Sequence, residues 1–269
     1  MRKTQWQGWG PGEQAEHHYL VEPRTLAGGG DIRHVSEFLR ASGWQDKSKK
    51  GGPLVMESPD RAVLLSYDPY THPGGWTIRS AAQGNQAEWW AVIGRQAPVE
   101  IVAGLTDALT RSRSRSAHAP NVWAPLQEQH WHTQFEGRNY TASSPDGTAW
   151  MHFRQDGDGN ALWWSGARDE RGNGWIAQFA PSTPMHLVQA FSTALASPEP
   201  VMRPRGRVPH STKIRTTSVS VLPSQLSAWQ QARITAARAA TWARNSVRSP
   251  RPRTTPRHHA GAGAFRARR

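Results

Sequence analysis

Two stretches of this chain are copies of one another, and this duplication limits the folds that the chain can adopt. The phrase Ser58-Pro59-Asp60 returns as Ser144-Pro145-Asp146, 86 residues later. The same spacing joins six further pairs of identical residues: Trp89 and Trp175, Ala91 and Ala177, Pro98 and Pro184, Val102 and Val188, Ala108 and Ala194, and Leu109 and Leu195. Because self-similarity at one spacing marks a repeated structural unit, the chain is predicted to hold two equivalent units in tandem.

The two units share one order of predicted elements. Each begins with a helix, near residues 32–39 in the first unit and 121–129 in the second. Four short strands follow in each unit: residues 53–57, 62–67, 76–80 and 88–93, then 140–143, 148–153, 161–166 and 174–179. A helix opened by proline closes each unit, over residues 98–109 and 184–196. This order predicts an α+β fold in which each repeat is an antiparallel β-meander of about four strands with flanking helices.

Composition divides the chain into three regions: a first repeat at 17–110, a second repeat at 121–198, and a basic C-terminal region at 199–269. Residues 111–120 are predicted to be a linker, as are residues 199–220, which are rich in Pro, Arg, Ser and Thr. The low-complexity residues 249–269 are predicted to be disordered. A helix is predicted over residues 223–247, between the linker at 199–220 and the low-complexity segment at 249–269. Its apolar stripe is formed by Leu226, Trp229, Ala232, Ala236, Ala240, Ala243 and Val247.

The net charge of +13 belongs to the C-terminal region alone. Residues 1–199 hold 18 basic and all 20 acidic residues, whereas residues 200–269 hold 15 basic residues and no acid. Basic residues without acids attract phosphate backbones, so a basic C-terminal tail that binds nucleic acid without sequence specificity is predicted. An anionic membrane surface, a partner helix, or no dedicated ligand are the alternatives. The candidate polyanion-binding residues are Arg233, Arg238, Arg244, Arg248, Arg251 and Arg253.

Several classes of protein are disfavoured by what the sequence lacks. The chain has no cysteine, which removes disulfides, thiolate catalysis and Cys-type metal sites. No apolar run approaches the roughly 20 residues that span a bilayer. Residues 1–16 are predicted to be poorly ordered, and they lack the apolar core of a secretion signal. A cytoplasmic protein is therefore expected.

The motifs of the first copy are specific enough to suggest a family. They are Pro23-Arg24-Thr25-Leu26-Ala27-Gly28-Gly29-Gly30-Asp31, Ala41-Ser42-Gly43-Trp44, Ser58-Pro59-Asp60-Arg61, and Pro98-Val99-Glu100-Ile101-Val102-Ala103-Gly104-Leu105-Thr106. The second copy keeps Ser144-Pro145-Asp146-Gly147, Trp175-Ile176-Ala177 and Thr183-Pro184, but lacks the Ala-Gly-Gly-Gly-Asp lead-in. Over roughly residues 19–198 the chain resembles the tandem DUF317 or SPDY-motif domain family of actinobacteria, whose function is unknown. The resemblance implies the repeat architecture and no catalytic residue.

A serine and a carboxylate in each Ser-Pro-Asp phrase invite comparison with a serine hydrolase, which also needs a base against its serine. No histidine recurs at the 86-residue spacing; His34, for example, corresponds to Pro120. The favoured interpretation is a structural turn, in which proline sets φ and the aspartate accepts local amide hydrogen bonds. A hydrolase that uses Ser58 or Ser144 is the least favoured hypothesis, and no catalytic residue is predicted.

Three other patterns resemble ligand sites and are interpreted structurally. The run Gly28-Gly29-Gly30 lacks the Lys-Ser/Thr ending and the GxGxxG spacing of phosphate-binding loops, so it is predicted to lead into a helix capped by Asp31. Residues 156–160 resemble the opening of a calcium loop, but its sixth and twelfth positions, which require Gly and Glu, are Ala161 and Ala167, so a hairpin loop is predicted. No third ligand at a fixed spacing accompanies the histidine pairs at 17–18, 130 and 132, and 258–259. No metal and no cofactor are predicted.

Fourteen tryptophans are the other unusual feature of the composition. Adjacent tryptophans on a strand point to opposite faces of the sheet, so one member of each pair enters the core and its neighbour lies outward. The candidate binding surface, for a peptide or protein, is drawn from Trp89, Trp90, Trp163 and Trp164. The leading hypothesis is a non-enzymatic binding protein whose tail holds nucleic acid. The alternative is a protein-binding regulatory scaffold whose tail is incidental, and the oligomeric state and the packing of the repeats stay open.

Overall fold

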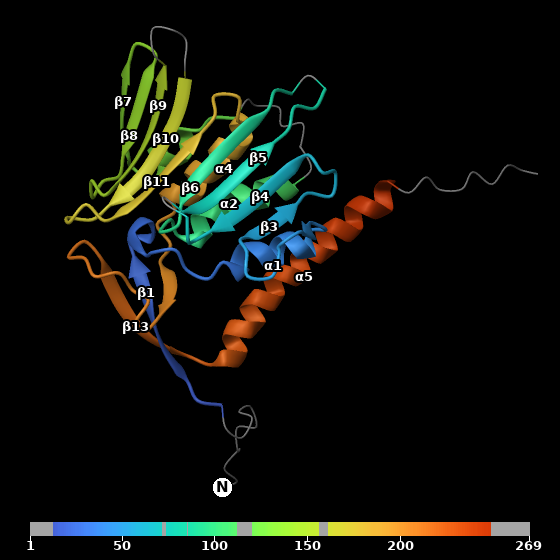
Figure 1. Cartoon of the computed structure of the whole chain (residues 1–269). Helices are drawn as coiled ribbons and strands as arrows, with labels where there is room; N and C mark the ends of the chain where they lie inside the picture. Colours follow the sequence, from blue (N-terminus) through green and yellow to red (C-terminus); the bar gives the residue numbers. More distant parts are fainter. Residues whose placement is uncertain (1–12, 72–73, 85, 112–119, 156–160, 249–269) are drawn as a thin grey trace, which may run out of the picture.

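The computed structural model describes residues 13–71, 74–84, 86–111, 120–155 and 161–248. Within these residues the main body is a ten-stranded antiparallel sheet with two helices packed on one face, and a three-stranded sheet lies beneath it in the view of Figure 1. The predicted α+β fold of two tandem antiparallel meanders is confirmed.

Each repeat contributes five of the described strands to the large sheet. The first repeat forms β2 (Gln45–Asp46), β3 (Leu54–Glu57), β4 (Val63–Asp68), β5 (Gly75–Ser80) and β6 (Trp89–Gly94). The second forms β7 (His132–Glu136), β8 (Asn139–Ser143), β9 (Ala149–Gln155), β10 (Ala161–Arg168) and β11 (Gly174–Phe179). The four strands predicted in each repeat are confirmed. The outermost strands β2 and β7 are additions, because all their residues are exposed and no apolar alternation marks them.

The two meanders join edge to edge through their last strands. Strands β6 and β11 pair antiparallel, so the strand order is mirrored about this pair: β2-β3-β4-β5-β6-β11-β10-β9-β8-β7. Val92 lies opposite Gln178 in that pair, and the two positions are 86 residues apart in the chain. A pseudo-twofold axis therefore passes between them.

Helices α2 (Val99–Thr110) and α4 (Met185–Ala196) follow the last strand of each repeat and pack against each other. Gly104 of α2 lies at the closest point of their contact. A Cβ atom there would lie 2.5 Å from the Cβ of Ala194 and 3.1 Å from the carbonyl oxygen of Ala190. The absence of a side chain at Gly104 therefore permits the close approach of the two helices.

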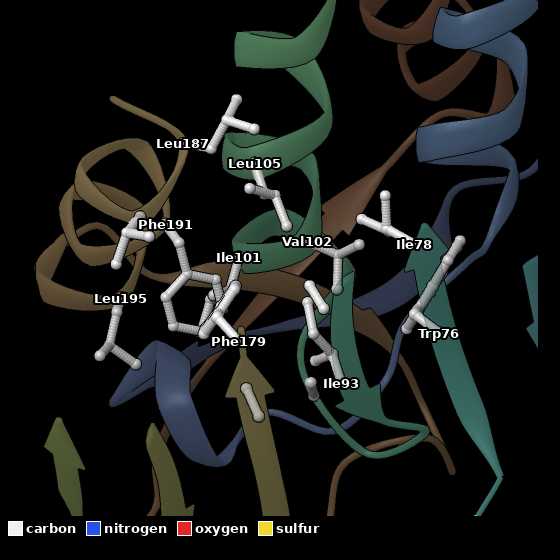
Figure 2. Packing of buried hydrophobic residues seen from close by; sticks show 14 of the residues in the cluster. Trp76, Ile78, Ile93, Ile101, Val102, Leu105, Phe179, Leu187, Phe191 and Leu195 are labelled. Carbon is white, nitrogen blue, oxygen red and sulfur yellow. The ribbon is translucent and has the colours of Figure 1, made fainter. Parts of the chain in front are cut away.

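The core lies between this helix pair and the sheet. Figure 2 shows the side chains that meet there: Ile101, Val102 and Leu105 from α2, Leu187, Phe191 and Leu195 from α4, and Trp76, Ile78, Ile93 and Phe179 from the central strands. Each of these ten residues is at most 2 % exposed. Because one cluster draws side chains from both repeats, neither repeat closes a core of its own.

The duplication extends to the orientation of aromatic rings. The ring centroids of Tyr67 and Trp76, on β4 and β5, are 4.6 Å apart with an interplanar angle of 47°. Those of Phe153 and Trp163, on β9 and β10, are 4.7 Å apart at 46°. Trp163 is thus the structural counterpart of Trp76, at a spacing of 87 residues instead of 86, and a single fixed spacing in the sequence does not align this pair.

Each repeat opens with a helix, as the sequence predicts: α1 (Arg33–Ala41) in the first and the shorter α3 (Ala124–Glu128) in the second. Ile32 is the N-cap residue of α1, so the predicted cap at Asp31 is wrong by one residue. Oδ1 of Asp31 still accepts the backbone N–H of Arg33, the first residue of the helix, at 2.9 Å. Helix α1 packs on α2, and α3 packs on α4. Both repeats therefore use the same arrangement of opening and closing helices.

The prediction that residues 199–220 form a linker is wrong. Strand β1 (Glu16–Glu22) pairs antiparallel with β12 (Val201–Pro204) on one side and with β13 (Arg215–Val221) on the other. Six of the seven residues of β13 are exposed or half-buried, so few apolar residues mark it as a strand in the sequence. It becomes a strand because its backbone pairs with β1, at the opposite end of the chain. The C-terminal region is thus partly built into the body.

Helix α5 (Pro223–Arg248) runs along α1 (Figure 1). The helix itself is confirmed, but its predicted apolar stripe is wrong. Ile234 and Ala237 are buried against the body, whereas most of the predicted stripe is exposed: Trp229, Ala232, Ala236, Ala240 and Ala243. The packed face is turned by about 100°, one residue around the helix, because contacts of Arg233 with α2 set the orientation of α5.

Some predictions concern residues outside the described ranges. They are most of the linker at 111–120, the calcium-loop-like segment at 156–160, most of the N-terminal segment at 1–16, and the tail at 249–269 with Arg251 and Arg253.

Candidate functional site

The face of the large sheet turned away from α2 and α4 is not covered by any helix of the described residues (Figure 1). We call the part of it formed by outward residues of β5, β6, β9, β10 and β11 the helix-free face; β3 and β4 continue the same side of the sheet and place Glu57 and Asp68 there. Side chains alternate between the two faces along each strand. Trp89 and Trp163 point into the core and are 3 % and 4 % exposed, so their place in the predicted binding surface is wrong. Their neighbours Trp90 and Trp164 lie on the helix-free face, and Trp90 is 37 % exposed.

Three tryptophans form a diagonal on the helix-free face: Trp90 on β6, Trp164 on β10 and Trp150 on β9. Trp164 shares a cross-strand row with Gln178 and Val92. Trp90 lies two positions from that row in one direction along the strands. Trp150 lies two positions from it in the other direction. The diagonal therefore crosses the junction between the two repeats.

Trp150 was not singled out from the sequence, and a glycine and an arginine position its ring. A Cβ atom on Gly166 would lie 2.6 Å from Cζ2 of Trp150, so the indole occupies the space above this glycine. The guanidinium carbon of Arg168 lies 5.6 Å from the ring centroid of Trp150, a cation–π distance. Alternation of side chains along the strand could have indicated that Trp150 points outward, because it precedes Met151, whose side chain is fully buried.

Among the Lys, Arg, Asp and Glu residue types, only arginine occurs on the helix-free face. Arg79 on β5, Arg154 on β9 and Arg168 on β10 are exposed, and β5, β6, β9, β10 and β11 contain no acidic residue. Arg79 lies directly opposite Trp90 on the neighbouring strand. Burial, and secondarily the charge of Arg154, lowers the pKa of His152 on the same face. This histidine is therefore neutral at pH 7, and the arginines set the charge of the face.

The indole N–H of Trp164 is shielded from solvent and has no hydrogen-bond acceptor in the described part of the chain. Buried donors in proteins are nearly always paired. This N–H is therefore unpaired among the described residues, and its shielding from solvent also separates it from a ligand on the face.

Arg233 was predicted to contact a polyanion, but its guanidinium is held inside the protein. It donates to both carboxylate oxygens of Asp107 on α2, at 2.9 and 2.6 Å. Its guanidinium carbon lies 4.3 Å from the ring centroid of Phe38 on α1. Arg233 therefore clamps α5 to both helices, and we withdraw it from the candidate polyanion-binding set. Arg238 on the same helix is exposed, and Arg244 and Arg248 lie in its last turns.

Arg203 of β12 is a second buried clamp, which sequence reasoning missed. It is 3 % exposed and pairs with both carboxylate oxygens of Glu100, at 2.7 and 2.8 Å. It also donates to the carbonyl oxygens of Ala27 and Gly28, both at 3.0 Å. The glycine run is therefore an acceptor of hydrogen bonds from an arginine and lies against the start of α2. This geometry matches its interpretation as a structural lead-in.

The two Ser-Pro-Asp turns are hydrogen-bonded alike. The hydroxyl of Ser58 donates to Oδ1 of Asp60 at 2.6 Å and accepts the backbone N–H of Val63 at 2.9 Å. The hydroxyl of Ser144 donates to Oδ1 of Asp146 at 2.5 Å and accepts the N–H of Ala149 at 2.9 Å. Both serines are thus committed to holding the turn that registers two strands.

The pKa of Asp146, the aspartate of the second turn, reflects the hydrogen bonds of this turn. Burial by itself raises the pKa of Asp146, but hydrogen bonds from Ser144 and Thr148 outweigh burial, and the net pKa is lowered. The carboxylate is therefore ionised at neutral pH and acts as an acceptor within the turn.

A cleft of about 520 Å³ lies where the repeats meet the small sheet. Its apolar part includes Leu26, Trp175 and Ile214, and its polar part includes Arg95 and Asp169. Asp169 is engaged in its own turn, since it accepts the backbone N–H groups of residues 171 and 173. Among the described residues, no group of three or more His, Asp or Glu side chains is placed to hold a metal ion.

This architecture defines a class of protein: a tandem-repeat α+β protein whose repeats share one sheet and leave one sheet face uncovered. A family model described as SPDY, a domain of unknown function (DUF317), matches the chain twice in tandem, at residues 57–115 and 143–201. Each match includes the Ser-Pro-Asp turn and the closing helix, and the predicted resemblance is confirmed. Neither a curated protein nor a solved structure matches the chain.

Proposed function

We propose that the protein is a non-enzymatic binding protein of the cytoplasm that holds nucleic acid through its basic C-terminal region. The observation that carries this proposal is the charge of residues 200–269, with 15 basic residues and no acid. Basic side chains that neutralise phosphates release condensed counterions, and this release drives binding. The lack of cysteine fits a reducing compartment. No helix in the described part of the chain is long and apolar enough to cross a membrane.

The way the C-terminal region is attached supports the proposal. Strands β12 and β13 pair with β1, and the clamps at Arg203 and Arg233 tie β12 and α5 to α2. Several basic residues of this region stay exposed among or just after these anchors: Arg205, Arg207, Lys213, Arg215 and Arg238. A nucleic acid attracted to the region is thus held beside the body.

The test is a salt series of binding to a fluorescently labelled 20-base-pair duplex, read by anisotropy with the full chain. One variant changes five tail arginines to serine: Arg251, Arg253, Arg257, Arg266 and Arg268. A matched variant changes five basic residues that are exposed on the body: Lys49, Lys50, Arg111, Arg138 and Arg171. Truncation at residue 199 is unsuitable, because it removes β12, β13 and α5 and leaves β1 without partners.

We expect the tail variant to bind the duplex at least about tenfold more weakly at 0.1 M salt, because each lost phosphate contact removes about 0.9 from the slope of log K against log salt. The body variant is expected to stay within about threefold of the natural chain. Equal weakening of the two variants would show that the tail has no special part in binding.

A protein-binding scaffold is the second candidate, and the edge strand β7 favours it. Strand β7 ends the sheet order. Phe135 on β7 and Tyr140 opposite it on β8 are 59 % and 37 % exposed. Tyr140 stacks on Trp123 with ring centroids 5.4 Å apart. An open edge beside aromatic rings suits an added peptide strand. Thr133→Lys on β7 would weaken binding of such a peptide strand without changing duplex affinity. Affinity capture with the natural chain and the variant in parallel would measure the difference in peptide binding.

A further inference from the structure

The helix-free face combines two features that nucleic acids recognise. Three tryptophans cross it diagonally, and the exposed arginines Arg79 and Arg154 flank that diagonal in strands without acidic residues. We propose that this face binds single-stranded nucleic acid, with bases stacked on the tryptophans and phosphates paired with the arginines. The inference rests on the proposed function, because it adds to the C-terminal region a second surface of the same nucleic-acid-binding protein and names the strand class that this surface takes.

The tryptophans provide the stacking surface. Aromatic side chains on a sheet stack with unpaired bases whatever the base, because every base has a π face. Trp150 and Trp164 lie on neighbouring strands and in rows two residues apart. The strand spacing of about 4.8 Å and the rise of about 3.4 Å per residue therefore separate their Cα atoms by roughly 8 Å. Trp90 continues the line across the junction of the repeats. A strand that follows this line meets successive indoles.

Two of the arginines lie beside an aromatic ring. Arg79 is the cross-strand neighbour of Trp90, and Arg168 lies over the ring of Trp150. A guanidinium stacked on an indole loses part of its freedom before a ligand arrives, and it still directs N–H donors outward. Trp90 and Trp150 thus each have an arginine in the same part of the face.

The chemistry of the face favours a single strand over the other partners. In a duplex the base faces are already stacked on one another, so a tryptophan on a sheet reaches only splayed bases. A second copy packed face to face would bring Arg79, Arg154 and Arg168 of both chains together. The two acids of the neighbouring strands on this side are already engaged, Glu57 with Lys47 and Asp68 with the backbone N–H groups of its own turn. A polyanion with flat, unpaired rings satisfies both the charge and the aromatic surface.

The experiment uses the full chain and two fluorescein-labelled probes, a 20-nucleotide oligothymidine and a 20-base-pair duplex. We expect Trp90→Ala to weaken oligothymidine binding by about tenfold, the scale of one lost base stack, with duplex binding unchanged. Trp90→Phe keeps an aromatic face and is expected to stay within about threefold of the natural chain. Trp242→Ala, which removes an indole that is 83 % exposed on α5, is the matched control and should have no effect.

The phosphate contacts are tested separately with the double variant Arg79→Ala, Arg154→Ala. Each contact removed from a single strand lowers the slope of log K against log salt by about 0.7, so a decrease of about 1.4 is expected. Arg111→Ala, which removes an exposed charge at the end of α2, should leave the slope unchanged for this probe. Thermal melting by circular dichroism checks that each variant is folded.

The outcomes separate this inference from the proposed function. Unchanged oligothymidine affinity in folded Trp90→Ala overturns the sheet-face site, while a tail-dependent duplex affinity leaves the proposed function standing. Failure of the natural chain to bind either probe at low salt overturns both. A change in sedimentation mass of Trp90→Ala, with oligothymidine affinity unaltered, identifies the face as a protein interface and also overturns the inference.

Discussion

Val92 of the first repeat lies directly opposite Gln178, its counterpart in the second repeat, on the paired strands β6 and β11. Equivalent residues meet in this way on a twofold axis, so each repeat presents the same strand edge to the other. The last strand of a lone repeat would leave its N–H and C=O groups open to other chains. Duplication within one chain pairs that edge permanently and places the helices α2 and α4 together over one core.

The contact between α2 and α4 leads to a prediction at Gly104. Gly104→Ala should lower the free energy of unfolding by about 1 to 3 kcal/mol, because overpacking of a tight core costs that much and the new Cβ would lie 2.5 Å from the Cβ of Ala194. Urea unfolding measures the change. Gly52→Ala is the control, because Gly52 is exposed and the new Cβ would lie 3.4 Å from the carbonyl oxygen of Lys49, an ordinary contact distance. Adding Ala194→Gly should restore most of the loss, and no recovery would contradict this steric explanation.

Arg203 is predicted to contribute much more to stability than a surface arginine. Arg203→Ala leaves Glu100 largely buried without its partner and should lower the unfolding free energy by about 3 to 5 kcal/mol. Arg215→Ala breaks the exposed contact with Glu22 and should cost at most about 1 kcal/mol. Chemical denaturation of both variants gives the comparison. Similar losses in the two variants would show that burial of Arg203 has no special effect.

Glu100 predicts how stability depends on pH. Burial raises the pKa of Glu100, but the contact with Arg203 outweighs burial and holds the pKa below its ordinary value. A carboxylate with a lowered folded pKa stabilises the protein above its unfolded pKa of about 4.3, and this contribution disappears as the pH falls through the folded pKa. The unfolding free energy should therefore fall between pH 5 and pH 3. Urea titrations of the natural chain and of Glu100→Gln at several pH values measure this fall in the free energy of unfolding. If the unfolding free energy of Glu100→Gln fell as steeply with pH as that of the natural chain, Glu100 would be excluded as its cause.

Arg233 is predicted to keep α5 attached to the body. Arg233→Ala removes two hydrogen bonds to Asp107 and the contact with Phe38, a loss of about 2 kcal/mol for hydrogen bonds to a charged group. We expect amide hydrogen exchange in α5 to accelerate by about tenfold or more, with β6 and β11 unchanged. Arg238→Ala on the exposed side of α5 is the control. Equal exchange in the two variants would show that packing of Ile234 and Ala237 alone holds the helix.

The tryptophan pairs show how far the candidate site could be predicted. Alternation along a strand requires Trp89 and Trp90 to lie on opposite faces, and it leaves open which of them is buried. The packing of α2 and α4 decides this: Trp89 belongs to the core beneath the helices, and Trp90 is exposed on the other side. Arg79, Arg154 and Arg168 escaped notice because an arginine on a strand carries no functional signal until neighbouring strands place it beside a tryptophan.

The amino-acid sequence by itself determined the duplication, the two meanders, the closing helices, the Ser-Pro-Asp turns and the separation of charge, because each depends on residues close together in the chain. The tertiary structure decided the rest: the edge-to-edge pairing of β6 with β11, the strands β12 and β13, the face on which α5 packs, and the burial of Arg203. These features depend on partners far apart in the chain. Arg203 meets Glu100 across 103 residues, and β13 is a strand because β1 offers it a backbone to pair with.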